Sequence, residues 1–359
     1  MSEANRVLLV DDETSVTDSL RKALQPLRAS WTIESATSAR GALELIDRQP
    51  FDVVIADMQM PEMDGAGLLA VVKEMCPAAA RVICSTRNEK SHALRAVRVA
   101  HRFLHKPCPP GTLIEFLARR AKIAKADETI RERVGAISML PCDSETAVKL
   151  ECLVEETDLR LDIIAEAVES EPVLIMKMLQ LASSSFFGVK RQTDDVRSAV
   201  AFAGRELLTM LAHFAVESST FEISAKELDL PALRFHGAAV AAVAKKSAGQ
   251  SPHADACFVA GMLHDVGKIV MAIHEPETFD AISVRARTEN ISFEKAEIAE
   301  GVRTHTAAGA ALVELWGLPQ TVVDAVAKQH DDRYDIEYLD PTAAVRLAHN
   351  VPMRAIGRH

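Results

Sequence analysis

Several features that mark exported or membrane proteins are missing from this sequence. Its six cysteines form no Cys-x-x-Cys pair, which favours reduced thiols over a disulfide framework. No apolar run approaches the roughly 18 residues that a membrane span requires. Residues 1–6 lack the basic start and the apolar stretch of a signal peptide. Together these absences predict a cytoplasmic protein with no membrane partner.

A basic surface for nucleic acid is also missing. Residues 1–122 hold 17 Lys and Arg against 15 Asp and Glu, whereas the remainder holds 24 against 36. After residue 122 we find no helix-turn-helix pattern with clustered Lys and Arg. Such an acidic C-terminal region argues against a DNA-binding output, which would normally present a basic face. Nucleic acid is therefore not expected as a partner.

The length predicts more than one domain, because 359 residues exceed what one hydrophobic core usually holds. Within residues 1–122, short apolar runs alternate with helical patterns such as 15–27 and 39–48, as in βα units. Strands are expected at 6–10, 31–36, 51–56, 81–85 and 102–105. This order predicts an α/β fold with a flavodoxin-like, doubly wound parallel sheet of five strands.

Polar side chains stand where four of these apolar runs end. Asp11 and Asp12 follow the first run, and Asp57 closes the third. Ser85 closes the fourth run, and Lys106 follows the fifth. In an open parallel sheet the carboxyl ends of the strands share one crevice. We therefore expect carboxylates, a hydroxyl and an ammonium group to meet there and to form a site that takes up a phosphoryl group.

The residue types suit that chemistry. A carboxylate such as that of Asp57 can attack phosphorus and form an acyl phosphate. Mg²⁺ prefers oxygen ligands and is usually held by one or two carboxylates together with phosphate, which Asp11 and Asp12 can provide. Lys106 adds a positive charge, and the hydroxyl of Ser85 can donate a hydrogen bond to a phosphoryl oxygen.

Residues 5–122 resemble the receiver domain of bacterial response regulators, because these polar residues follow the same order and stand at the same strand ends as in that family. The resemblance implies that Asp57 is the phosphoacceptor. It also implies a Mg²⁺ site made by Asp12, Asp57 and the backbone carbonyl of Gln59, with Asp11 acting through water. The alternative is a degenerate receiver, a flavodoxin-like domain in which these acids are incidental.

The same resemblance points to the residues that respond to phosphorylation. Ser85 aligns with the switch Thr or Ser of receivers, although the neighbouring Thr86 leaves the alignment open by one residue. Phe103 matches the aromatic switch position, and Lys106-Pro107 matches a peptide bond that is often cis in the family. These residues are expected to reshape one face of the domain when the phosphoryl group arrives.

From residue 135 onward the pattern changes to helices alone. Apolar residues recur at helical spacing in 159–168, 173–181, 199–214 and 234–248. We expect a receiver domain at 1–122, a helical linker at 123–134 and a helical output domain at 135–359. The linker helix could transmit rotation or form the seam of a homodimer. It could equally be a solvated, charged connection.

An ordered set of motifs runs through the helical half. The motifs are Leu140-Pro141, Glu171-Pro172, His264-Asp265-Val266-Gly267-Lys268, His305 and Trp316-Gly317-Leu318-Pro319. This set resembles the HDOD domain, a helical relative of the HD phosphohydrolases, over residues 135–355. The chain departs from the HD-GYP cyclic-di-GMP phosphodiesterases, because Asp331-Asp332-Arg333-Tyr334 follows His330 in place of Gly-Tyr-Pro.

Two interpretations of the His–Asp motif remain open. The resemblance places a possible metal site at His236, His264, Asp265, His305, His330 and His349. If these side chains converge, an Fe, Mn or Zn ion held by mixed nitrogen and oxygen ligands could activate water for attack on a phosphoester. The alternative is a helical core in which they only cross-link helices, since HDOD domains generally lack a complete catalytic set.

Two functions are expected from this combination. In the first, a sensor histidine kinase phosphorylates Asp57 of a two-component response regulator. Its HDOD output domain then regulates a downstream signalling protein, such as a kinase or a cyclase, without catalysis. In the second, phosphorylation controls a metal-dependent HD-type phosphohydrolase that acts on a nucleotide or cyclic dinucleotide. We favour the first, so the chain is not expected to be an enzyme.

Overall fold

The protein is described from a computed structural model, which covers residues 5–86, 95–126, 128–182, 193–331 and 340–349. The chain forms two compact units. Unit 1 comprises residues 1–138 together with 180–191, and unit 2 comprises residues 139–179 together with 192–359. Residues 123–134, which the sequence predicted as a linker, lie within unit 1.

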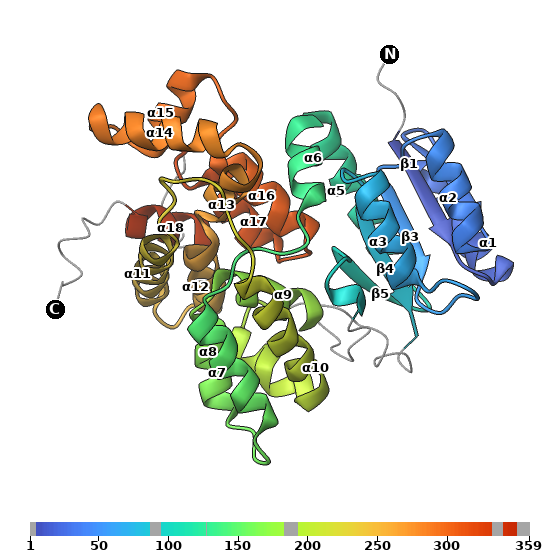
Figure 1. Cartoon of the computed structure of the whole chain (residues 1–359), viewed down its shortest axis with the longest axis horizontal. Coiled ribbons are helices and arrows are strands. Elements are labelled where there is room, and N and C mark those ends of the chain that lie inside the picture. Colours follow the sequence, from blue (N-terminus) through green and yellow to red (C-terminus); the bar gives the residue numbers. More distant parts are fainter. Residues whose placement is uncertain (1–4, 87–94, 127, 183–192, 332–339, 350–359) are drawn as a thin grey trace. The chain divides into compact units, whose positions relative to one another are not determined.

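Unit 1 is built on one parallel sheet of five strands in the order β2-β1-β3-β4-β5 (Figure 1). The strands are β1 Asn5–Val10, β2 Trp31–Ala36, β3 Val53–Asp57, β4 Ala80–Ser85 and β5 Arg102–His105. All residues of β3 and β4 are buried, as expected where helices cover both faces of a parallel sheet. The predicted α/β fold with a doubly wound parallel sheet of five strands is confirmed. The order reverses between β1 and β3, so a crevice opens at their carboxyl ends.

The helices of unit 1 cover both faces of this sheet. They are α1 Thr14–Ala23, the 3₁₀ helix η1 Gln25–Leu27, α2 Ala39–Arg48, α3 Gly65–Met75, α5 Pro110–Ala126 and α6 Glu128–Ala136. Helix α1 packs against α5, and α2 packs against α3. The helix predicted at 15–27 ends at Ala23 because Pro26 has no amide hydrogen and its ring would clash within a continuing helix.

Within the described residues of unit 2, every regular element is a helix. The helices are α7 Ser144–Glu155, α8 Leu161–Glu169, α9 Pro172–Ala182, α10 Val196–Ser219, α11 Leu230–Ala248, α12 Ala254–Leu263, α13 Val266–His274, α14 Pro276–Thr288, α15 Phe293–Glu300, α16 His305–Leu315, α17 Gln320–Lys328 and α18 Pro341–His349. Helix α11 packs against α12 and α18, and α16 packs against α13 and α17. The predicted all-helical domain is confirmed.

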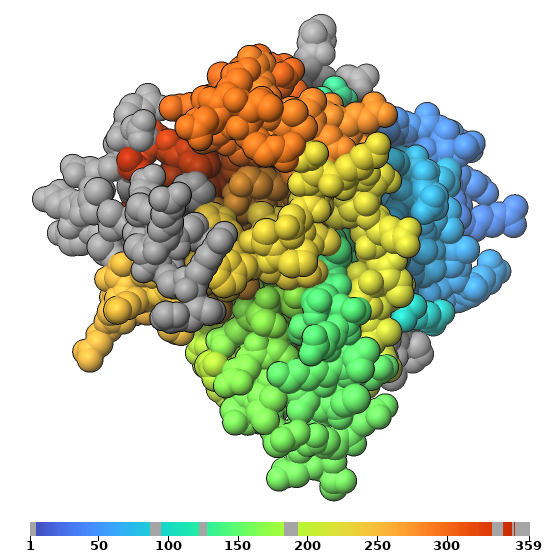
Figure 2. All heavy atoms as spheres, turned by 60° about the vertical axis from the view of Figure 1, so that its left-hand side comes forward, coloured from blue at the N-terminus to red at the C-terminus, as the bar shows by residue number. Residues whose placement is uncertain are grey.

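A small satellite core holds α14 and α15 in place. Phe279, Ile282 and Ala296 from these helices pack with Met271 and with the chain segment that follows α10. Figure 2 shows that segment in yellow beside the orange α14 and α15. The carboxylate of Asp280 accepts hydrogen bonds from the backbone amides of 226 and 227, at 3.1 and 2.8 Å. This core fixes α15, which supplies side chains to the His–Asp cluster described below.

By length and composition alone, two helical stretches would qualify as membrane spans, although the sequence had suggested no such run. They are Val196–Ser219 and Ala254–His274. A core helix of a folded domain passes the same test, and most of the second stretch is buried inside unit 2. The second is also broken between α12 and α13, and Gly204 interrupts the first with a φ of 69°. Both stretches are therefore core helices of unit 2.

Helices α13 and α16 approach closely because Gly267 has no side chain. A Cβ atom at Gly267 would overlap the carbonyl oxygen of His305 and would lie 2.7 Å from the amide nitrogen of Gly309. Such an overlap can be relieved only by moving the backbone of one helix. Gly267 therefore fixes the distance between Asp265 and His305, which flank this contact.

We predict that Gly267→Ala lowers the stability of unit 2 by about 1–3 kcal/mol, because the added methyl group pushes α13 and α16 apart. The shift in the thermal unfolding of the full chain, followed by circular dichroism, measures this loss. Gly111→Ala in α5 is the matched control, since a Cβ there meets nothing within 4 Å. An unchanged melting temperature for Gly267→Ala would contradict the close contact.

Candidate functional site

The carboxyl edge of the sheet in unit 1 gathers two acids and a lysine. Asp11 follows β1, Asp57 ends β3, and Lys106 follows β5. Lys106 Nζ lies 2.7 Å from Asp11 Oδ2 and also forms an ion pair with Asp57 Oδ1. Both carboxylates are buried, with exposed fractions of 3% for Asp11 and 5% for Asp57. The ammonium group therefore neutralises two buried negative charges that repel each other.

Backbone amides hold the remaining oxygens of these carboxylates. Asp57 Oδ2 accepts a hydrogen bond of 2.9 Å from the amide of Gln59, and Asp11 Oδ1 accepts one of 3.0 Å from the amide of Glu13. Burial by itself disfavours the charge on Lys106. The hydrogen bonds and charges of Asp11 and Asp57 outweigh burial and raise the pKa of Lys106 above its ordinary value. Lys106 therefore stays protonated at neutral pH, in contact with both acids.

The other predicted residues of this site lie around the cluster at different depths. Asp12 and Gln59 are exposed, whereas Ser85 is fully buried as the last residue of β4. Thr86 follows the strand and is exposed. The carbonyl oxygen of Ser85 accepts a hydrogen bond of 2.9 Å from the amide of Lys106, so Ser85 is the residue level with the lysine.

Two further predicted features lie on the β5 side of the site. Phe103 is buried within β5. The Lys106–Pro107 peptide bond is cis.

This edge of the sheet fits Mg²⁺. The hard cation prefers oxygen ligands, and two carboxylates from neighbouring strands face one point. Exposed Asp12 stands beside them in the chain, and Gln59 follows Asp57 by two residues. The oxygen donors are therefore of the kind that Mg²⁺ needs.

In unit 2, three elements bring a second polar cluster together. His236 comes from α11, and His264 and Asp265 lie at the break between α12 and α13. The Nε2 atoms of the two histidines are 3.2 Å apart. Asp265 Oδ2 lies 3.4 Å from His264 Nε2 and 3.8 Å from His236 Nε2. These three side chains thus converge as the sequence suggested.

The ring of His264 is oriented for binding through Nε2. Its Nδ1 lies 2.6 Å from the carbonyl oxygen of Gly261. A carbonyl oxygen only accepts, so Nδ1 carries the proton and Nε2 turns a lone pair toward the cluster when the ring is neutral. Gln329 donates a hydrogen bond of 2.6 Å to the carbonyl oxygen of His264 and fixes the backbone. Such outer hydrogen bonds orient metal-binding histidines in proteins.

His305 approaches Asp265 from the opposite side. Its Nε2 lies 3.3 Å from Asp265 Oδ1, and its Nδ1 donates a hydrogen bond of 2.9 Å to Glu297 Oε2. The backbone amide of His305 donates a second one of 2.7 Å to Glu297 Oε1. Burial opposes a charge on His305, but the hydrogen bonds to Asp265 and Glu297 outweigh it and raise the pKa of the ring. Sequence reasoning missed Glu297, which is separated from Asp265 by helices α13 and α14 and by the loop before α15.

Lys268 is the nearest cation to Asp265. Its Nζ donates a hydrogen bond of 2.7 Å to Asp265 Oδ2 and lies 5.1 Å from the ring centre of Phe293. Burial favours the neutral acid, but the charge of Lys268 and a hydrogen bond from His305 outweigh it. They hold the pKa of Asp265 well below its ordinary value. Asp265 is therefore an anion that is held by Lys268 at Oδ2 and faces His305 at Oδ1.

The remaining histidines of the predicted set lie at the edge of this cluster. The ring of His330 is 5.5 Å from that of His305. Burial, together with a neighbouring histidine in each case, lowers the pKa of His236 and of His330 to about 4. Both rings are then neutral at physiological pH, which is the form that binds metals. The side chain of His349 lies outside the described residues.

The cluster fits a transition metal only in competition with Lys268. The ligand atoms of His236, His264 and Asp265 all lie within 4.8 Å of one another, and imidazole with carboxylate suits Zn, Fe or Mn. The carboxylate oxygen that faces both histidines is also the one that Lys268 holds. A bound divalent ion would therefore have to share this oxygen with an ammonium group or displace it.

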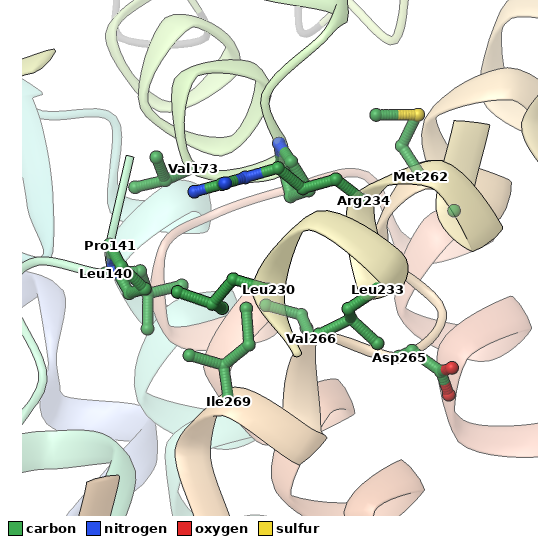
Figure 3. Close-up of a pocket in the computed structure, with 12 residues that line it drawn as sticks. Leu140, Pro141, Val173, Leu230, Leu233, Arg234, Met262, Asp265, Val266 and Ile269 are labelled. Carbon is green, nitrogen blue, oxygen red and sulfur yellow. The ribbon is translucent and has the colours of Figure 1, made fainter. Parts of the chain in front are cut away.

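An apolar hollow lies beside this cluster. It is lined mostly by apolar residues from the segment before α7 and from α9, α11, α12 and α13 (Figure 3). Its cavity volume is about 20 Å³, which holds roughly one water molecule. The guanidinium of Arg234 in its wall is already paired with Glu171, at 3.0 Å. Figure 3 shows the carboxylate of Asp265 pointing away from Leu140 and Pro141. In this packing the hollow is too small for a nucleotide.

Family comparison assigns both units. Residues 7–118 match the response regulator receiver domain, and residues 140–332 match the HDOD domain. The second match alone covers more than half of the chain. Both are domains of soluble signalling proteins, and a receiver domain implies a cognate histidine kinase and a Mg²⁺-dependent phosphorylation site.

Individual proteins resemble the chain at moderate identity. The response regulator protein FleR of Pseudomonas aeruginosa is 26% identical over 229 residues, which are 62% of this chain and 46% of FleR. The chain spans less than half the length of several curated relatives that it matches, FleR among them.

Solved structures resemble parts of the chain. The crystal structure of the MmoQ response regulator from Methylococcus capsulatus is similar at 23% identity and a TM-score of 0.48, covering 58% of this chain and 86% of that one. An HDOD domain protein of unknown function from Geobacter sulfurreducens is similar at 25% identity and a TM-score of 0.37, covering 61% and 75%. The chain belongs to the HDOD family and is a response regulator, with a receiver domain in unit 1 and an HDOD domain in unit 2.

Proposed function

We propose that Asp57 accepts a phosphoryl group from the cognate histidine kinase and that the HDOD domain passes this signal to a partner protein without catalysis. The observation that carries the proposal is the buried cluster of Asp11, Asp57 and Lys106 at the carboxyl edge of the sheet. Two buried carboxylates beside an ammonium group are costly to assemble, and phosphoryl transfer requires all three groups.

In the proposed reaction, an oxygen of Asp57 attacks the phosphorus of a phosphohistidine. The new O–P bond forms as the P–N bond breaks, and the leaving imidazole takes a proton from solvent. Asp57, Asp12 and the carbonyl of Gln59 would hold Mg²⁺, with Asp11 acting through water, and the ion would supply positive charge to the phosphoryl oxygens.

Lys106 and Ser85 would stabilise the product. Lys106 is placed to exchange its ion pair with Asp57 for one with the phosphoryl group, since it already bonds both carboxylates. The hydroxyl of Ser85 would donate a hydrogen bond to a phosphoryl oxygen. We assign the switch role to Ser85 because it ends β4 beside Lys106, whereas Thr86 lies beyond the strand and is exposed.

Two observations in unit 2 support an output without catalysis. Lys268 occupies the oxygen of Asp265 that a metal would need, and the hollow beside it is too small for a nucleotide. In this proposal the downstream partner is a signalling protein such as a kinase or a cyclase, and the response regulator works in the cytoplasm. The proposal also includes a homodimer of this chain.

One observation favours the second candidate, a metal-dependent phosphohydrolase. His236, His264 and Asp265 present three ligand atoms to one point, and both outer hydrogen bonds of His264 hold that orientation. A bound transition metal would supply an activated water for attack on a phosphoester. Metal binding alone does not separate the two candidates, but hydrolysis of nucleotides or cyclic dinucleotides does.

We predict that Asp57→Ala removes labelling by radioactive acetyl phosphate in the presence of Mg²⁺, because it removes the carboxylate that is proposed to become the acyl phosphate. Filter binding of the purified full chain measures the label. Asp18→Ala is the matched control, since Asp18 is an exposed acid of α1 and should leave the labelling unchanged. An undiminished label in Asp57→Ala would refute the assignment.

We also predict that Lys268→Met strengthens Zn²⁺ binding, on the order of tenfold, because it removes an ammonium charge from beside the divalent ion. His264→Ala should weaken binding in turn, about 10–100-fold. Isothermal titration of the metal-free chain gives the affinities, and His253→Ala, an exposed histidine before α12, is the control. Equal affinities in the wild type and Lys268→Met would show that the lysine and the metal do not compete.

A further inference from the structure

Helix α6 is bound to the edge of the receiver sheet opposite the acid cluster. Arg131 of α6 forms an ion pair with Oδ1 of Asp52, the residue before β3. The other oxygen of Asp52 accepts a hydrogen bond of 2.7 Å from the backbone amide of Arg6 in β1. The first half of α6 is thereby attached to the amino ends of β1 and β3.

The second half of α6 contacts the chain just before β4. A Cβ atom at Gly135 would lie 2.6 Å from the carbonyl oxygen of Pro77 and 2.8 Å from the Cα atom of Ala78. Both neighbours are backbone atoms and cannot rotate away. Helix α6 can therefore lie this close only because residue 135 is glycine.

Two buried side chains hold the carboxyl end of α6. Arg81, the second residue of β4, donates a hydrogen bond of 2.8 Å to the carbonyl oxygen of Gly135. His101, the residue before β5, places Nε2 3.1 Å from the carbonyl oxygen of Ile137. Burial and the charge of Arg120 lower the pKa of Arg81 to about 9, so Arg81 stays protonated at neutral pH. A cation at the end of a helix stabilises its unpaired carbonyl groups.

The same two strands reach from this contact to the phosphorylation site. Strand β4 carries Arg81 near its start and Ser85 at its end. At one end of the β4–β5 pair, the amide of His101 donates a hydrogen bond of 2.8 Å to the carbonyl oxygen of Arg81. At the other end, the amide of Lys106 donates one of 2.9 Å to the carbonyl oxygen of Ser85. The pair is thus tied at both ends.

We propose that the amino edge of the receiver sheet is the surface through which this protein passes on its phosphorylation state, with α6 as the element bound there. The inference rests on the proposed phosphorylation of Asp57. The chain enters unit 2 immediately after residue 138, so a change in how α6 is held reaches the HDOD domain through the backbone.

The two attachments of α6 explain how phosphorylation of Asp57 would move this helix. Arg131 ties α6 to the β1–β3 side through Asp52, whereas Gly135 and Ile137 are tied to the β4–β5 side through Arg81 and His101. A phosphoryl group on Asp57 draws Lys106 and Ser85 toward β3 and shifts one pair of strands against the other. Because close-packed interiors transmit such shifts, α6 must follow or release one attachment.

The test uses the full chain, with acetyl phosphate and Mg²⁺, and follows amide hydrogen exchange in residues 140–331. Gly135→Ala pushes α6 off Pro77 and Ala78, and Arg131→Met removes the other attachment. Gly111→Ala and Arg119→Met are matched controls in α5, where a Cβ on Gly111 meets nothing within 4 Å and Arg119 pairs with Glu115 one turn earlier.

We expect all five proteins to label on Asp57 to the same extent. Phosphorylation should change exchange in residues 140–331 of the wild type and of both controls, and at least half of that change should be lost in Gly135→Ala and in Arg131→Met. The inference is overturned if phosphorylation changes amide exchange in Arg131→Met and in a folded Gly135→Ala as much as in the wild type. It is also overturned if the wild type is labelled but its exchange in residues 140–331 does not change. An unlabelled wild type would instead sink the phosphorylation proposal and this inference with it.

Discussion

The receiver half depends on the ion pairs that Lys106 forms with two buried carboxylates. Asp11 and Asp57 lie on neighbouring strands at the point where the strand order reverses, and each is almost completely buried. Without Lys106, two like charges would face each other in a medium of low polarity, which is strongly unfavourable. The lysine makes the site stable before any phosphoryl group arrives, and it also gives that group a cation to bind.

The helical half solves a similar problem at Asp265. Lys268 and His305 neutralise this buried acid, and Glu297 in turn holds His305 through two hydrogen bonds. The two sites differ in whether the lysine leaves room for a ligand. Lys106 stands where a phosphoryl group can use its charge, whereas Lys268 holds the oxygen that faces both metal-binding histidines. A cluster in which a lysine already holds the metal-facing oxygen favours a domain that signals by contact over one that hydrolyses.

Features that depend on neighbouring residues in the chain could be predicted from the sequence, whereas contacts between distant residues could not. Strand ends followed by acids predicted where the receiver cluster would lie, and the helix at 39–48 begins where predicted because Ser38 caps its amino end. Glu297 and Gln329 escaped notice, since they contribute to the cluster from positions 32 and 64 residues after Asp265 and match no local pattern. Residues 123–134 were predicted as a linker from charge and helical propensity, which say nothing about Asp52 or Arg81 as partners.

By itself, the sequence determined the two families, the two fold classes and the residue types at the carboxyl edge, because apolar periodicity and motif order are local properties of the chain. Only the tertiary structure decided the partners of each charge. It placed Lys268 on Asp265 and bound α6 to the far edge of the sheet. Those outcomes depend on which side chains meet across long separations in a crowded interior, where a single Cβ atom at residue 135 or 267 would prevent the contact.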